Sequence, residues 1–321
     1  MKPKWVWFSV LMVVIIPYVL FSLCEGEEPA SQEILSNKDE AYQTIKLVDG
    51  DSVKEIEIDQ YITGVLLGEL SDDFEMHAMM AQAVAARTYT LRRVQLQLKH
   101  NNADVCTDHN CCQAYENPEN YQNLQFLEGV QEAVKATANQ VLMYNDQLIE
   151  ATYFSCSGGQ TEDAVAVWGT DIPYLRSVRS PGEEKAVNYE KRIEYERKEF
   201  LSLLGLPENL LLYRDSVEIT YTNGGGVKNM SIGDSTFSGT QLRVLLNLPS
   251  TAFALEFYPD KIVIITRGSG HRVGLSQYGA DAMAVSGRSY FDILMHYYPG
   301  TELVTLSPEQ LQAIFDKVQN L

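Results

Sequence analysis

The central part of the fold is predicted from residues 61–93, YITGVLLGELSDDFEMHAMMAQAVAARTYTLRR. Glu69 is a lone carboxylate in an apolar run, just ahead of a long amphipathic segment. Residues 71–73, Ser-Asp-Asp, offer N-cap oxygens, and apolar residues then recur at spacings of three and four positions. The pattern predicts a short helix, a tight turn and a long helix reaching about Lys99.

The neighbours of Glu69 give its carboxyl an unusual environment. Leu66, Leu67 and Leu70 flank it in the sequence, and a carboxyl held among aliphatic side chains is harder to ionise than one in water. Such a group keeps a proton near neutral pH and can donate it as a general acid. The alternative is a glutamate that only caps or pairs at a helix junction.

Length, composition and charge limit the class of protein. The chain has 321 residues, of which 45% are hydrophobic and 10% aromatic, so a packed core is expected and a disordered protein is excluded. The formal net charge of -18 argues against nucleic acid as a partner, because no basic surface is evident to neutralise phosphates.

An uncharged apolar run, WVWFSVLMVVIIPYVLFSLC, occupies residues 5–24. It is long enough to span a bilayer as a helix. Two lysines precede it and glutamates follow, so the amino terminus is expected in the cytoplasm, the segment in the cell membrane as a single pass, and the rest of the chain outside. A cleaved signal peptide is the alternative. Residues 25–42 are predicted to be a flexible linker.

Hydrophobic patterning beyond the linker predicts an α+β fold, with a mixed core of helices and strands that carries a substrate groove. We assign the core to residues 43–181 and 258–321, the second part ending in a C-terminal helix. A smaller helix and hairpin lobe at residues 182–257 interrupts it. Residues 1–24 hold the cytoplasmic start and the anchor.

Short sequence signals place the expected elements. They are a hairpin over 42–59 turning at 49–51, a helix over 130–140, strands on either side of Asn145-Asp146, a helix over 190–206 ending near Gly205, a hairpin around Asn223-Gly224, a capping box of Ser238 and Gln241, a strand over 261–266 and a helix over 280–298 with a break at Gly287.

A cluster of cysteines has the spacing of a metal site. Cys106, Cys111 and Cys112 occur in CTDHNCC, with His100 upstream and His109 inside the motif. Three thiolates and one of the two histidines, with His100 preferred, suit tetrahedral zinc, and four protein ligands leave no position for water, so the site would be structural. A disulfide is the alternative for an exported chain.

Two further stretches are candidates for a substrate groove. The first, residues 153–181, mixes hydroxyl groups, paired glycines, an indole and basic residues without helical or strand periodicity, which suits sugar binding by hydrogen bonds and ring stacking. The second, residues 267–303, is rich in glycine and hydrogen-bonding side chains. Surface or structural loops are the alternative for both. The candidate substrate-binding residues here are Tyr153, Ser155, Gly158, Trp168, Arg176, His271, Gln277 and Tyr278.

Taken together and in this order, the motifs resemble the SpoIID/LytB domain family of peptidoglycan lytic transglycosylases over residues 42–303. The resemblance is carried by GVLLGELSDDFEMHAMMAQAVAARTYTL, by the cysteine segment ending in CQAY, by FSCSGGQTEDAVAVWGTDIPYLRSVRSP, and by GHRVGLSQYGADAMA with HYYPGTEL. Three positions depart from the family pattern: Ser71 stands where a proline is common, Arg272 interrupts GHGVG, and Cys156 replaces a frequent serine.

The resemblance implies a function and the residues that carry it out. Glu69 matches the catalytic glutamate, Arg87 an arginine of the active groove, and Arg176 and Tyr278 fall in substrate-groove motifs. The implied reaction cleaves peptidoglycan glycan strands without water during endospore formation (engulfment), beside a cell-wall amidase and other sporulation membrane proteins. A non-catalytic glycan-binding scaffold that activates such an amidase is the alternative, and a metal hydrolase is disfavoured by the closed ligand set.

Overall fold

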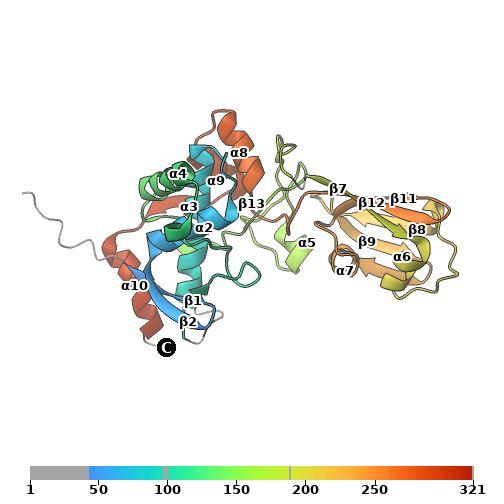
Figure 1. Cartoon of the computed structure of the whole chain (residues 1–321), viewed down its shortest axis with the longest axis horizontal. Coiled ribbons are helices and arrows are strands. Elements are labelled where there is room, and N and C mark those ends of the chain that lie inside the picture. Colours follow the sequence, from blue (N-terminus) through green and yellow to red (C-terminus); the bar gives the residue numbers. More distant parts are fainter. Residues whose placement is uncertain (1–42, 97–99, 101, 188, 320–321) are drawn as a thin grey trace, which may run out of the picture. The chain divides into compact units, whose positions relative to one another are not determined.

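The computed structural model describes residues 43–96, 100, 102–187 and 189–319, and in it the chain has the expected mixed α+β fold (Figure 1). The expected anchor at residues 5–24 and the linker at 25–42 lie outside these residues. In the part of the chain that is described, no helix combines the length and apolar character needed to cross a membrane.

The amino-terminal hairpin and helix pair are confirmed. Strand β1 (Thr44–Asp49) pairs antiparallel with β2 (Ser52–Glu57) across a turn at Gly50, whose φ of +61° suits glycine. Helix α2 (Ile58–Glu69) follows at once, and α3 (Met76–Leu96) comes after a short turn. Residues 97–99, the expected end of the long helix, lie outside the described residues.

The start of α3 differs from the expectation of a local cap. The helix begins at Met76, and the Glu75 backbone N–H donates to Asp281 Oδ1 at 2.7 Å. Asp72 instead accepts hydrogen bonds from the side chains of Tyr121 and Asn123. The orphan N–H of this helix end is therefore satisfied by a residue far along the chain.

Helix α3 is the centre of the larger hydrophobic core. It contacts α2, the helices α4 (Leu124–Ala136), α8 (Gln277–Val285), α9 (Tyr290–Tyr297) and α10 (Pro308–Gln319), and strand β4 (Gln140–Tyr144). Its alanines at positions 81, 83, 85 and 86 are fully buried. Because alanine side chains are small and favour helix, neighbours can approach this helix closely on several sides.

Short strands and turns complete this core. The turn at Asn145 and Asp146 is confirmed, both with positive φ, and Gly287 (φ +88°) separates α8 from α9 as expected. The helix expected over 130–140 lies earlier, at Leu124–Ala136, where Asn123 caps it. The remaining elements are β3 (Val105–Cys106), the 3-10 helix η1 (Pro118–Asn120), β5 (Gln147–Leu148), β6 (Tyr153–Phe154), α5 (Ala164–Trp168), β13 (Leu275–Ser276) and β14 (Glu302–Thr305).

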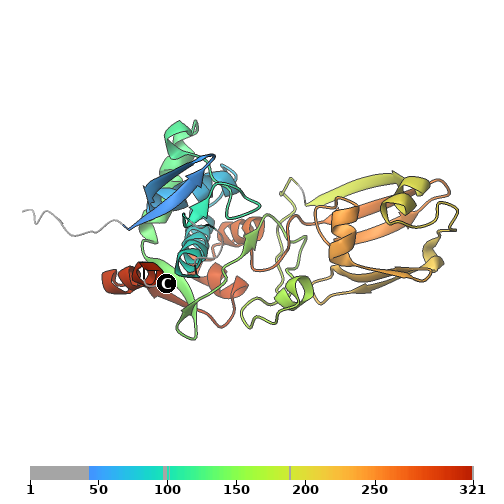
Figure 2. The same ribbon diagram turned by 90° about the horizontal axis from the view of Figure 1, so that it is seen from below.

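A second hydrophobic cluster lies between two three-stranded sheets, which Figures 1 and 2 show with their helices. The sheets have the orders β10-β9-β8 and β11-β12-β7. The hairpin at Asn223-Gly224 and the capping box at Ser238 are confirmed. The elements are β7 (Glu190–Glu196), α6 (Arg197–Leu203), the 3-10 helix η2 (Arg214–Ser216), β8 (Val217–Tyr221), β9 (Val227–Ile232), β10 (Ser235–Ser238), α7 (Gly239–Leu245), β11 (Ala252–Phe257) and β12 (Lys261–Arg267).

Two expectations for this lobe need correction. The helix expected over 190–206 is helical only from Arg197 to Leu203, because Ile193 and Tyr195 alternate with charged residues and pair as strand β7 with β12. The lobe also extends past residue 257, since Ile262 and Ile264 of β12 pack into its cluster.

A buried ion pair joins the loop between β12 and β13 to the segment before α5, and the tip of the β8–β9 hairpin bonds to both of its residues. Arg272 Nη1 lies 3.2 Å from Glu162 Oε1, and the two residues are 2% and 1% exposed. Arg272 also donates to the carbonyls of Ser157, Gln160 and Gly224. Arg272, the departure from GHGVG, has a backbone φ of +65°. Its guanidinium binds three carbonyls and a carboxylate.

We predict that Glu162→Gln destabilises the protein by about 3–5 kcal/mol, because it removes the carboxylate that is paired directly with the buried Arg272 charge. Urea unfolding measures the free energy. Glu194→Gln is the matched control: this glutamate pairs with Lys261 at 2.7 Å on the surface, where water screens the charges, so little change is expected. Equal unfolding free energies for the two variants would contradict the assignment.

Candidate active site and metal centre

Glu69 is the last residue of α2, and its carboxyl is held by donors from two distant segments. The backbone N–H of Ala114 donates to Oε1 at 2.9 Å, and the Gln277 side-chain Nε2 donates to Oε2 at 3.0 Å. Leu66, Leu67 and Leu70 beside it are buried. Each carboxylate oxygen therefore has one partner, while the group itself remains partly accessible.

Burial raises the pKa of Glu69 above its ordinary value, as the flanking leucines predicted. The hydrogen bonds from Ala114 and Gln277 act in the opposite direction, because they stabilise the ionised form. The carboxyl can therefore hold a proton, and the two hydrogen bonds stabilise the carboxylate when that proton is lost.

The Ala114 donor is positioned by close packing of its loop on α2. Gly68 and Gly64 have no side chain, and a Cβ on Gly68 would lie 2.8 Å from the Tyr115 nitrogen. The Glu116 N–H also donates to the Gly64 carbonyl at 3.0 Å. Only glycine at these two positions lets the loop lie flat on the helix.

A buried polar network lies next to this loop. Gln113, 2% exposed, donates to Thr90 at 3.0 Å and to the Tyr61 hydroxyl at 3.3 Å, and accepts from the Tyr153 hydroxyl at 2.8 Å. Burial raises the pKa of Tyr153 well above its ordinary value, and the negative charge of Glu69 adds to the effect. Tyr153 therefore stands near Glu69 as a neutral phenol.

Tyr278 follows Gln277, the donor to Glu69, and bonds close to Glu69 in the sequence. Its hydroxyl is 2.9 Å from Ser71 Oγ, and its ring meets Phe74 edge-on at 5.1 Å. Ser71, one of the departures from the family pattern, thus supplies a partner for the tyrosine expected in the groove. Proline at this position would have no such hydroxyl.

Trp168 and His271 form a second group of candidate residues. The Trp168 ring, 42% exposed, lies 5.4 Å from the His271 ring, which in turn lies 5.6 Å from Phe154. Burial lowers the pKa of His271 to about 4, and its Nδ1 accepts the Val273 N–H, so the ring is neutral. The exposed indole is available for stacking.

Three candidates bond to segments other than the one that carries Glu69. Arg176 binds Asp171 at 2.5 Å and the Pro173 carbonyl within its own loop. The Gly158 N–H donates to Glu183, and the Ser155 carbonyl accepts the Tyr278 N–H at 3.1 Å. These contacts order the loops, and no hydrogen bond among the described residues joins these three to Glu69.

Arg87 is not placed as expected. It is 1% exposed, forms an ion pair with Asp59 at 3.1 Å, and donates to the carbonyls of Thr137, Val134 and Gln140. Its guanidinium satisfies the carboxyl end of α4, and no hydrogen bond among the described residues joins it to Glu69. The assignment of Arg87 to substrate binding is therefore wrong, since a buried arginine with these partners cannot touch a glycan.

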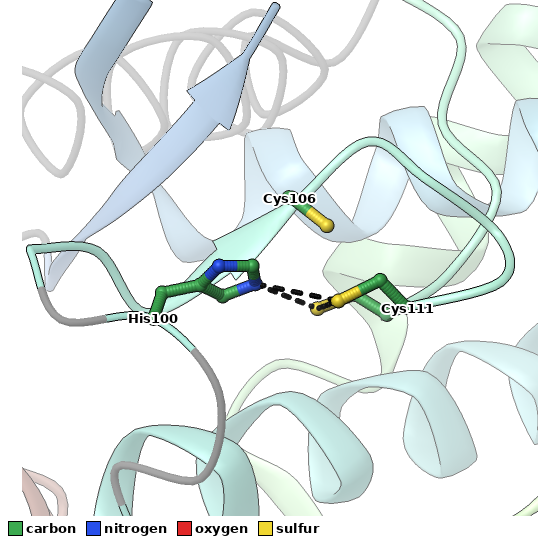
Figure 3. A group of neighbouring side chains, drawn as sticks. His100, Cys106 and Cys111 are labelled. Atoms are coloured by element: carbon green, nitrogen blue, oxygen red, sulfur yellow. Dashed lines mark hydrogen bonds between the residues drawn. The ribbon is translucent and has the colours of Figure 1, made fainter.

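The cysteine cluster forms a compact group of possible metal ligands. The ligand atoms of His100, Cys106, Cys111 and Cys112 all lie within 4.8 Å of one another. His100 Nε2 is 3.5 Å from Cys112 Sγ and 3.7 Å from Cys111 Sγ (Figure 3). The two sulfurs of the adjacent cysteines are 4.0 Å apart, roughly twice the S–S distance of a disulfide.

These distances fit tetrahedral coordination. Zinc–sulfur bonds of about 2.3 Å at tetrahedral angles separate two sulfurs by about 3.8 Å, close to the observed spacing. His109 is outside the group: its side chain is 74% exposed and turned to Asp108. The residues that can hold a metal are thus three cysteines and His100.

Comparison with known proteins identifies the relatives of this chain. Residues 49–144 match the family described as stage II sporulation protein. The chain is 34% identical over 264 residues to stage II sporulation protein D of Bacillus subtilis (strain 168), covering 78% of this chain and 76% of that protein. It is 35% identical over 262 residues to the same protein of Bacillus amyloliquefaciens, covering 78% and 75%.

The chain belongs to the stage II sporulation protein D family. A more distant relative is the amidase enhancer of Bacillus subtilis (strain 168), 26% identical over 299 residues, with 76% of this chain and 40% of that protein covered. The family name confirms the resemblance seen in the sequence motifs and a connection with sporulation.

Gln113 and Ala114 are site positions that the sequence motifs did not single out, although they follow the cysteines directly in CQAY. The only available signal was their place next to the predicted metal ligands. A backbone donor such as the Ala114 N–H leaves no trace in residue type.

Proposed function

We propose that this stage II sporulation protein D family member is a peptidoglycan lytic transglycosylase with Glu69 as its single catalytic acid and base. The observation that carries the proposal is the setting of Glu69, a partly buried carboxyl with a raised pKa and donors on both oxygens. Its two hydrogen-bond donors are a backbone amide and a glutamine side chain, so no second carboxylate from the described residues is bonded to it. Hydrolases that act on glycosides normally need two.

In the proposed reaction, protonated Glu69 gives its proton to the glycosidic oxygen between N-acetylmuramic acid and N-acetylglucosamine. The bond from this oxygen to C1 breaks, and the ionised carboxylate removes the proton of the C6 hydroxyl. That oxygen closes onto C1, which yields a 1,6-anhydro end without water. Gln277 and Ala114 stabilise the carboxylate midway, and Tyr278 and Trp168 offer sugar contacts.

The biological setting follows from the relatives. The family name supports a role in endospore formation, and we propose engulfment as the step. The name of the amidase enhancer relative supports an amidase as partner, and we propose that this is a cell-wall amidase. We also propose other sporulation membrane proteins as partners. The same relative favours a second candidate function, a glycan-binding scaffold that activates the amidase without cleaving glycan itself.

We predict that Glu69→Gln lowers glycan cleavage by roughly 100 to 10,000-fold, the usual contribution of general acid catalysis, while glycan binding persists. Mass spectrometry of products from purified peptidoglycan measures both the rate and the anhydro ends. Asp292→Asn serves as the carboxylate control, because Asp292 lies at an exposed helix cap and bonds to Ser289 beside it. A scaffold would be indifferent to the Glu69 change, and product carrying oxygen from labelled water would mean hydrolysis.

The raised pKa of Glu69 also sets the sign of the pH dependence. Cleavage needs the protonated form, so the rate should fall as pH rises through this pKa. Folding stability also falls as pH rises. The stabilisation from the proton bound to Glu69 is complete below the unfolded pKa of about 4.3 and is lost as pH rises through the folded pKa. Glu69→Gln should therefore melt no lower than wild type at neutral pH.

We propose that His100, Cys106, Cys111 and Cys112 hold one structural zinc ion. Elemental analysis of protein purified without a metal-affinity tag should find one zinc per chain, lost in Cys112→Ser and kept in His109→Ala, because the exposed His109 lies outside the cluster. Metal removal should chiefly unfold the loop that carries Ala114. Protein that never contains zinc would contradict the assignment.

We propose that residues 5–24 anchor the protein in the cell membrane with its domain outside the cytoplasm. The support is the uncharged run and its charge asymmetry. The full-length chain should stay in the membrane fraction after alkaline carbonate washing, and a chain starting at residue 25 should not. A mature amino terminus downstream of Cys24 would show a cleaved signal peptide instead.

A further inference from the structure

A fully buried carboxylate, Glu183, lies outside the site described so far, and its donors converge on it from three segments. Its residue is 0% exposed. The backbone N–H groups of Ser157, Gly158 and Gly159 donate to it at 2.8–3.1 Å. The hydroxyls of Ser157 and Ser180 donate at 2.8 and 2.7 Å. A buried carboxylate is tolerated only when it is satisfied in this way.

The remaining donor connects Glu183 to α8. Ser276 is the N-cap of that helix: its hydroxyl donates to Glu183 and accepts the Gly279 N–H at 3.3 Å. One serine thus joins the buried carboxylate to the first turn of the helix. Gln277, the next residue, is the side chain that donates to Glu69.

Helix α8 in turn lies along the whole segment that begins at Glu69. Gln277 binds Glu69, Tyr278 meets Ser71, and Asp281 accepts the Glu75 N–H at 2.7 Å. These are successive contacts from one short helix to one turn. The position of the helix therefore fixes the donor on Glu69.

We infer that Glu183 is a positioning residue that holds the amino terminus of α8, through Ser276, so that Gln277 stays on the Glu69 carboxyl. This inference rests on the proposed function of Glu69. Its energetic link to the reaction passes through two hydrogen bonds.

Variants along this chain of contacts should behave alike. Gln277→Ala removes the donor, and Ser276→Ala removes the link. Glu183→Gln replaces one acceptor oxygen of the anchor with an amide donor and removes its charge, while leaving the Ser276 cap in place. Each should raise the pKa of Glu69 by about one unit, because a donor to the ionised form is lost or misplaced. The double variant Ser276→Ala/Gln277→Ala should match Gln277→Ala alone.

Ser180→Ala is the matched control. It also removes one hydroxyl donor from Glu183, but Ser180 bonds to the Tyr297 hydroxyl and, among the described residues, forms no hydrogen bond to α8. The pKa of Glu69 should stay at its wild-type value. The titrating or charged groups near Glu69 are Tyr153 and His109, and those near Glu183 are Tyr297, Cys156, Arg272 and Tyr189, all unchanged in these variants.

Carbon-13 NMR titration of the Glu69 carboxyl, assigned by its absence in Glu69→Gln, reads this pKa without any activity. The alkaline limb of glycan cleavage should move to higher pH by the same amount. A wild-type protein without cleavage would refute the lytic function and leave the titration test intact. Glu183→Asp replaces Glu183→Gln if the latter does not fold.

Three results would overturn the inference. They are a wild-type titration of Glu69 in Ser276→Ala, an equal shift in Ser180→Ala, or a shift in Ser276→Ala that is absent in Glu183→Gln. The last would show that the loss of the helix cap alone is responsible.

Discussion

The site depends on one carboxyl that is withdrawn from water and still hydrogen-bonded on both oxygens. Burial among leucines favours the protonated form of Glu69, while Ala114 and Gln277 favour the ionised form. A group that must give and then accept a proton needs both influences, because either alone would fix it in one state. The two donors come from positions 114 and 277, so much of the fold serves to bring them together.

Each donor has its own support, and the two supports are of different kinds. The Ala114 loop lies on a glycine face of α2 and directly follows the cluster of possible metal ligands. The Gln277 side is held by hydrogen bonds to buried charged groups, Glu183 at the helix start and Asp281 further along. Asp281 also pairs with Lys185. Buried charges with such partners favour a single defined arrangement, since any shift leaves a charge without its partners.

The sequence could predict whatever depends on local pattern. The hairpin at Gly50, the break at Gly287 and the capping box at Ser238 follow from turn and cap chemistry. It could not predict the partner of the Glu75 N–H or the burial of Arg87, because both depend on segments more than forty residues away. The local pattern predicts helix for Glu190–Glu196, but this segment is a strand because pairing with β12 determines its conformation.

The departures from the family pattern show how a local rule can be broken when the surroundings compensate. Arg272 takes a backbone conformation that glycine adopts freely, and it removes a large charge from water. Glu162 and three carbonyls satisfy that charge, and Gly226 has no side chain at the point where a Cβ would lie 2.3 Å from Glu162 Oε1. An arginine at this position therefore requires the acid and the glycines of the hairpin tip together, so these residues are best understood as one unit that joins the hairpin to the loop beside the candidate groove.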